Sequence, residues 1–96
     1  MKVKVGDFYA NETTSSLGNE KNIMYVREKT DYPGIYKTEN LFLIDERTVD
    51  LYRSEWVEDF VERHATNAEI KKYLEERQSY VSLRTYSEVV TGIKIQ

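Results

Sequence analysis

The chain has 96 residues, of which 40% are hydrophobic and 32% charged, a composition suited to one soluble domain (1–96) with a modest core. It contains no cysteine, which excludes a disulfide framework, thiolate metal ligation and thiol chemistry. The formal net charge of -3 disfavours affinity for duplex DNA, because such affinity comes mainly from neutralising phosphates with basic side chains.

The N-terminal segment combines an alternating pattern with a polar stretch. Val3 and Val5 alternate with lysines and precede Gly6, which predicts a first strand over residues 2–9 with a bend at the glycine. Residues 11–22 are almost entirely polar, a composition typical of an exposed loop. We therefore expect a loop between the first two strands.

Three further strands are predicted in the first half of the chain. The apolar run 23–26 predicts the second strand, and the Tyr-Pro-Gly sequence at 32–34 predicts a turn after it. Residues 35–44 predict the third strand, whose last four residues are all apolar and should form the centre of the core. Alternation over residues 49–52 predicts a fourth strand, so these strands should form an antiparallel meander.

Residues 54–64 fit two structures. Trp56 and Phe60 are four residues apart, as on one face of a helix. A single 3₁₀ turn over 54–57, followed by a short strand over 60–65, would instead close a small barrel. We favour the turn and strand.

The clearest local signal is the capping box formed by Thr66 and Glu69, which predicts a helix over about 66–78. Its core-facing side chains recur at helical spacing and are Ile70, Tyr73, Leu74 and Arg77. Residues 80–95 return to a period of two and predict a C-terminal strand pair. The expected fold is α+β, a small antiparallel sheet or SH3-like barrel with this helix and strand pair.

Charge is concentrated in residues 45–62, where seven acids against two bases give 2 − 7 = −5. A negative field beside large aromatic side chains favours binding to a basic surface of another protein. We therefore predict a partner-binding surface in this segment. Its candidate residues are Asp50, Glu55, Trp56, Glu58, Asp59, Phe60 and Glu62.

No pattern supports catalysis. His64 is the only histidine and belongs to no metal-binding motif, the serines lie in no G-x-S-x-G context, and the four glycines stand singly. We predict a non-catalytic protein with no cofactor and no metal.

Two functions other than protein binding also fit parts of the sequence. A single-stranded nucleic-acid binder could stack bases on strand tyrosines and use Arg27, Lys29 and Lys37 as phosphate contacts, although the acidic balance disfavours it. A structural role in a virion is the remaining alternative. No apolar run approaches the roughly 18 residues of a membrane span, and no targeting segment is recognisable. We expect a cytoplasmic monomer.

One resemblance covers residues 49–74, through the Ser-Glu-Trp sequence at 54–56 and the Ala-Thr-Asn-Ala-Glu-Ile sequence at 65–70 that opens the helix. This order resembles small uncharacterised proteins of phages and prophages of Gram-positive bacteria, some with SH3-like barrels. The resemblance implies a phage-encoded inhibitor that binds a host nucleic-acid-processing or defence enzyme through its acidic, aromatic surface, in the cytoplasm of a bacterial host. The extension 79–96 departs from that pattern.

Overall fold

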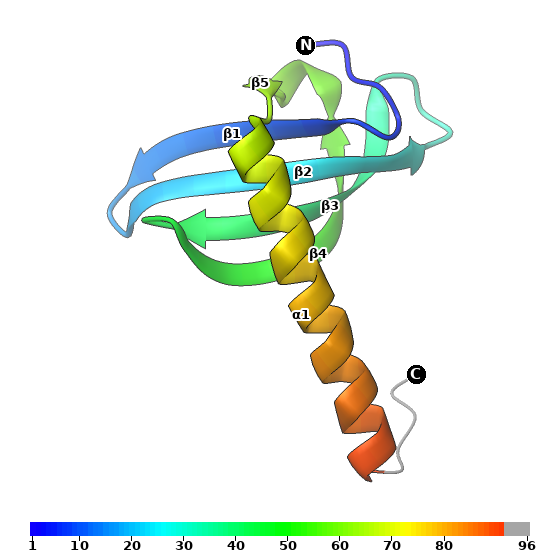
Figure 1. Ribbon diagram of the computed structural model, residues 1–96. Helices are drawn as coiled ribbons and strands as arrows, with labels where there is room; N and C mark the ends of the chain where they lie inside the picture. The colour runs from blue at the N-terminus through cyan, green and yellow to red at the C-terminus, as the bar shows by residue number, and fades with distance from the viewer. Residues whose placement is uncertain (92–96) are drawn as a thin grey trace.

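The structure is a computed structural model that describes the backbone of residues 1–91 and the side chains of residues 1–80. Five strands precede one long helix (Figure 1). In chain order the elements are β1 (Phe8–Ser15), β2 (Gly18–Lys29), β3 (Ile35–Ile44), β4 (Arg47–Val57), the 3₁₀ turn η1 (Glu58–Phe60), β5 (Arg63–His64) and α1 (Asn67–Thr91).

All strand pairs are antiparallel, and the order across the sheet is β4-β3-β2-β1-β5. Strands β2, β3 and β4 form the predicted meander, β1 extends it by one strand, and β5 returns to pair with β1. The predicted α+β fold with a small antiparallel sheet and one helix is confirmed. Within the described residues the hydrogen-bonded sheet has β4 and β5 as its two edges.

The sheet carries a core on each face. On one face the N-terminal segment, β1, β2 and the segment after η1 bring together five buried side chains, with Tyr36 and Trp56 packed against them. These are Val3, Tyr9, Met24, Val26 and Val61. On the other face α1 places Tyr73 against Ile23, Leu41 and Leu43. Successive strand side chains point to opposite faces, so two cores can share the same four strands.

Two turns show why the central strands end where they do. The third strand has the predicted bounds, and it ends at Asp45 and Glu46, whose φ values of 48° and 66° make a tight hairpin turn into β4. The β1–β2 hairpin turns just before Gly18, whose φ is 128°. The two hairpin tips are joined, because Asn19 and Asp45 exchange backbone and carboxylate hydrogen bonds.

The predicted first strand and loop are wrong. Gly6 adopts a φ of 92° and ends the N-terminal segment, so that β1 begins only at Phe8. Residues 11–22, expected to be a loop, continue β1 and start β2 in a regular ladder from Asn11 with Asn22 to Ser15 with Gly18. This end of the hairpin is mostly exposed on both faces, so its sequence lacks the apolar alternation that marks a half-buried strand.

For residues 54–64 the predicted order of a 3₁₀ turn followed by a short strand is confirmed, but the predicted positions, a turn over 54–57 and a strand over 60–65, are wrong. Strand β4 continues to Val57, the turn occupies Glu58–Phe60, and β5 is limited to Arg63–His64. The alternative helix is absent from this segment. The turn reverses the chain so that β5 can pair with β1.

The predicted C-terminal strand pair is wrong, because α1 continues without a break to Thr91, well past the predicted end near 78. Residues 92–95 of that prediction lie outside the described residues. No glycine or proline occurs between Asn67 and Thr91, so nothing in the sequence stops the helix before Gly92. Figure 1 shows α1 crossing β1 to β4 obliquely and running on beyond the edge strand β4.

The predicted start of the helix is confirmed. The backbone N–H of Glu69 donates to the Thr66 hydroxyl at 3.2 Å, and the N–H of Thr66 donates to the Glu69 carboxylate at 2.9 Å. Of the predicted core-facing side chains Tyr73 is 2% exposed, whereas Leu74 is 52% exposed. The helix therefore docks mainly through Tyr73.

Candidate functional site

The candidate acidic residues on β4 do not share one surface. Leu51 packs against the α1-facing core, so Asp50 beside it points to the opposite face of the sheet. Glu55 is four residues from Leu51 along β4, so its side chain points to the same face of the sheet as Leu51, the face covered by α1. Asp50 and Glu58 are also separated by about 26 Å of extended chain. The predicted surface over residues 45–62 is therefore divided.

Several acids of the segment form contacts within the fold. Glu58 accepts the backbone N–H of Val3 at 3.3 Å and lies 3.7 Å from the Lys2 ammonium, and its side chain is only 12% exposed. Glu46 accepts a hydrogen bond from Lys21 at 2.8 Å. Asp45 accepts the N–H of Asn19. Basic and backbone groups from the first part of the chain thus offset part of the local charge.

Four of the candidate residues do lie together, on the turn η1 and the chain leaving it. We call this set the acidic ridge: Glu58, Asp59, Phe60 and Glu62. Asn11 of β1 clamps it, because its side-chain amide donates to the carbonyl of Phe60 at 2.7 Å and accepts the N–H of Glu62 at 2.8 Å. The Phe60 side chain is nevertheless 69% exposed. The ridge therefore presents an aromatic ring on a fixed backbone.

Trp56 contributes less to this surface than predicted. It is half-buried and packs against the core on the far side of the sheet from α1, opposite Tyr36 on β3. Glu58 and Asp59 also border an open cavity of about 500 Å³, whose other wall includes Tyr32 and Pro33. Tyr32 is 70% exposed, so an aromatic side chain borders the cavity together with these two acids.

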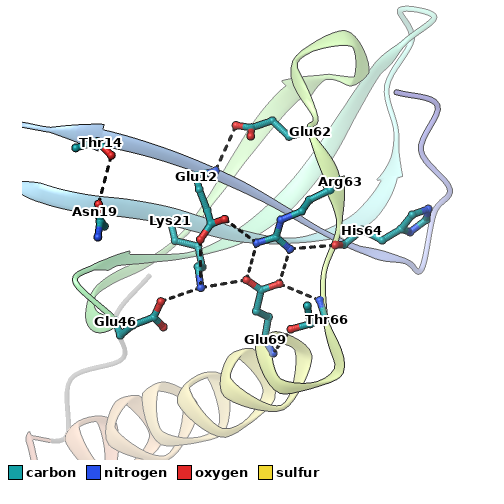
Figure 2. A network of polar contacts seen from close by, with 10 residues as sticks. All are labelled: Glu12, Thr14, Asn19, Lys21, Glu46, Glu62, Arg63, His64, Thr66 and Glu69. Carbon is teal, nitrogen blue, oxygen red and sulfur yellow. Dashed lines mark hydrogen bonds and ion pairs between the residues drawn. The ribbon is translucent and has the colours of Figure 1, made fainter.

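A second polar cluster joins the start of α1 to the sheet (Figure 2). Its centre is Glu69, which accepts two hydrogen bonds from Arg63, at 2.7 and 2.9 Å, and lies 3.1 Å from the Lys21 ammonium. Arg63 also bonds to Glu12, and Lys21 to Glu46. The cluster connects β1, β2, β5 and α1, and we interpret it as structural.

The protonation of Glu69 follows from these contacts. The bidentate bond from Arg63 is the largest influence, and together with Thr66 and Lys21 it outweighs burial and lowers the pKa of Glu69 to about 2. The same bond raises the pKa of Arg63. Glu69 is therefore ionised at neutral pH, as its capping role requires.

The third polar arrangement is a groove between α1 and the sheet, with a volume of about 390 Å³. Its floor is one row of side chains across four strands: Phe8 pairs with Tyr25, Tyr25 with Glu39, and Glu39 with Arg53. Side chains of α1 and one further arginine of β2 complete the lining, namely Tyr73, Leu74, Arg77 and Arg27. We call this the arginine groove.

Among the side chains of residues 1–80, Glu39 is the only carboxylate that lines the arginine groove. It accepts hydrogen bonds from the Tyr73 hydroxyl at 2.6 Å, from Arg77 Nε at 2.7 Å and from Arg53 Nε at 3.3 Å. Burial raises the pKa of this carboxyl, but the bonds from Tyr73 and Arg77 outweigh it and lower the pKa below its usual range. Burial, together with the anionic partner, raises the pKa of Tyr73. Glu39 thus stays ionised while Tyr73 keeps its proton.

The described residues contain no candidate metal site and no helix that could span a membrane. His64 stacks on Tyr9 with ring centroids 4.9 Å apart, which gives it a packing role. The described part of the chain contains no group of three or more His, Cys, Asp or Glu placed to hold a metal ion. Within those same limits, no helix has the length and apolar character needed to cross a membrane.

Comparisons with protein-family models, with curated proteins and with solved structures gave no match for this chain. Its function must therefore be argued from the surfaces themselves. The sequence pointed to the residues of the acidic ridge but missed the arginine groove. Glu39 lies 14 residues from Arg53 and 38 from Arg77, so only the strand register and the docking of α1 bring them together.

Proposed function

We propose that this protein is a non-catalytic binding module that docks its acidic ridge on a basic surface of another protein. The observation that carries the proposal is the exposure of Phe60, at 69%, on a backbone held by the two Asn11 hydrogen bonds. A rigidly presented aromatic ring can bury a large apolar area on binding without paying again for ordering the loop.

The charge around Phe60 supports a basic partner. Asp59 and Glu62 are exposed neighbours of the ring, whereas Glu58 is partly neutralised by Lys2. Exposed charges at the rim of an interface mainly accelerate association and oppose wrong partners. The ridge therefore combines an apolar anchor with a negative rim, which suits a basic patch that surrounds an apolar pocket.

The proposal is tested by affinity capture followed by measured binding. The resemblance to prophage proteins makes a lysate of a Gram-positive bacterium the first source of partners. The captured protein is then purified and its affinity measured for the wild type, for Phe60→Ala and for Leu17→Ala. Leu17 is the matched control, because it is 68% exposed but lies at the tip of the β1–β2 hairpin.

We expect Phe60→Ala to weaken binding by about tenfold or more, as for a central aromatic anchor, and Leu17→Ala to leave it within twofold. Circular dichroism should show both variants folded, because both side chains are exposed. Equal affinities for the two variants would remove the ridge from the interface and overturn the proposal.

A second experiment tests the role of the negative charges beside Phe60. The double variant Asp59→Asn with Glu62→Gln should slow association and reduce its dependence on salt, while Glu75→Gln, an exposed acid of α1, should not. Gln at position 62 can still accept the N–H of Glu12 that Glu62 accepts at 3.3 Å, so the fold should be kept. Unchanged salt dependence would contradict a basic partner surface.

A further inference from the structure

We propose that the arginine groove is a second binding site, which takes a small phosphorylated ligand with a planar ring, of the class of nucleoside monophosphates. The site is independent of the acidic ridge. Of the eight side chains that line it, six from four strands and the helix supply the rings and charges for such a ligand: Phe8, Tyr25, Arg27, Glu39, Arg53 and Arg77.

The arginine groove carries an excess of positive charge. Arginine is always protonated in proteins, so Arg27, Arg53 and Arg77 bring three positive charges against the single negative charge of Glu39, and 3 − 1 leaves +2. The chain as a whole has a net charge of -3. A local field of opposite sign to the whole molecule suits an anion placed in the groove itself.

Glu39 orients two of the arginines through hydrogen bonds. Arg53 and Arg77 both donate to Glu39 through Nε. Each guanidinium has five N–H donors, and within the described side chains the two Nη groups of each form no other hydrogen bond. The buried carboxylate therefore fixes the planes of two guanidinium groups whose outer donors remain available. Such fixed, planar donors match the oxygens of a phosphate.

A β-bulge supplies the third arginine. The pairing of β2 with β3 shifts between Val26 and Glu28, which leaves Arg27 without a partner residue in the ladder. Arg27 lines the groove and forms no ion pair with the side chains of residues 1–80. It can therefore contact a ligand without giving up a bond within the fold.

The floor of the groove favours a flat ring. Phe8 and Tyr25 are half-buried, with ring centroids 5.0 Å apart, and both pack against the buried ring of Tyr73. Leu74 on α1 is 52% exposed and flanks them. Aromatic and aliphatic surface next to fixed cationic groups is the composition of a site for a ring that carries an anion.

The size of the groove and the net charge of the chain select a small ligand. A volume of about 390 Å³ lies in the range of small-molecule sites. A long nucleic acid would extend beyond the +2 groove over a chain of net charge -3, where counterion release gives little affinity. A ligand with one phosphate group and one planar ring would be contained within the groove.

Calorimetric titration of the whole chain at about 50 mM salt tests the proposal with four probes: AMP, UMP, inorganic phosphate and adenosine. We expect both nucleotides to bind saturably, and more tightly than phosphate or adenosine alone, because only they engage both the arginines and the rings. A single-stranded oligonucleotide forms the fifth arm and should gain no more than a few fold over AMP.

Three variants locate the binding. Arg27→Gln leaves the contacts of Glu39 intact and should weaken AMP binding by about five- to tenfold, as should Arg53→Gln. Arg47→Gln is the control, since Arg47 is exposed on the same strand as Arg53 but does not line the groove, and it should stay within twofold. Circular dichroism confirms that each variant is folded.

Each contrary result overturns a defined part of the proposal. Absence of saturable nucleotide binding, or equal affinities for Arg27→Gln and Arg47→Gln, overturns the site. Phosphate that binds as tightly as AMP overturns the role of the rings, and an oligonucleotide that binds a hundredfold tighter overturns the small-ligand assignment. Phe60→Ala should not change AMP binding, so failure of the groove and failure of the acidic ridge can be told apart.

Discussion

Tyr73 of α1 donates its hydroxyl hydrogen to Glu39 of β3 across 2.6 Å, in a contact buried between the helix and the sheet. A buried carboxylate is costly unless donors surround it, and here Arg77 and Arg53 supply the others. The contact has two consequences. It fixes the docking of α1 through a side chain that is otherwise in the apolar core, and it positions the carboxylate that orients Arg53 and Arg77 in the groove.

The first prediction concerns the stability that Glu39 provides. Glu39→Gln removes the charge that the three donors share, and we expect a loss of about 2 kcal/mol in the free energy of unfolding. A larger loss is not expected, because the Arg53 side chain is 60% exposed and the Arg77 side chain 45% exposed, so water can solvate them. Urea denaturation at neutral pH gives the value.

The control for Glu39 is Glu75→Gln on the exposed side of α1, where the side chain is 63% exposed. Removing the charge of Glu75 should lower the free energy of unfolding by no more than about 0.5 kcal/mol, as for a surface ion pair. If both variants lose the same stability, Glu39 does not anchor the helix, and the geometry inferred for the arginine groove loses its basis.

The second prediction is a loss of stability in acid that depends on Glu69. Its pKa is lowered to about 2 in the folded protein, from an ordinary value of 4.5. Between those values the unfolded chain binds more protons than the folded one, so stability rises with pH there. The contribution of ionised Glu69 to the free energy of unfolding is fully present above about pH 4.5 and disappears as the pH falls toward 2.

We expect this contribution to be about 2 kcal/mol, somewhat less than the full pKa difference implies, because Arg63 is 37% exposed and partly screened. Urea denaturation of the wild type and of Glu69→Gln at pH 7, 4 and 2.5 measures it. The two proteins should differ most at pH 7 and converge at pH 2.5. A constant difference across that range would show that the ionisation of Glu69 is not the cause. The lowered pKa of Glu39 acts in the same direction and remains in both proteins.

The third prediction concerns the hydroxyl that caps α1. Thr66→Ala removes the acceptor of the Glu69 N–H and should destabilise the protein by about 1 kcal/mol. Thr66→Ser keeps an oxygen at that position and should recover most of the loss. Thermal unfolding of the three proteins provides the test, and equal losses for Ala and Ser would show that the methyl group rather than the cap matters.

The parts of this fold that were predictable depend on neighbours in sequence. The Thr66 and Glu69 pair is three residues apart, and the third strand contains a run of apolar residues, so both could be identified with their positions. The outer end of the β1–β2 hairpin could not be identified, because its ladder is exposed to water and its side chains show no period. Residues 80–91 have the composition of strands, yet α1 continues through them.

The candidate site shows the same division. Three residues of the acidic ridge lie close together because they are neighbours in the chain: Asp59, Phe60 and Glu62. The hydrogen bonds with Asn11 that hold this segment could be identified only from the structure. Asp50 was predicted to join them, but a long strand carries it away and points it to the other face of the sheet. The arginine groove is assembled by the strand register and by α1, which no spacing in the sequence encodes.

The last prediction concerns the two joined hairpin tips. Gly18 has a φ of 128°, a conformation that residues with a side chain rarely adopt, and a Cβ added there would overlap the carboxylate of Asp45. Gly18→Ala should therefore strain the backbone and also displace Asp45 from the N–H of Asn19. We expect a loss of about 2 kcal/mol in the free energy of unfolding, measured by urea denaturation.

Gly6→Ala is the matched control, because Gly6 has a φ of 92° but a Cβ there meets nothing within 4 Å, so this substitution introduces the backbone strain alone. Gly18→Ala should lose more stability than Gly6→Ala, and the difference should shrink when Asp45 is replaced by alanine in both backgrounds. If the difference is unchanged without Asp45, the carboxylate is not what restricts position 18, and the two tips are not coupled through it.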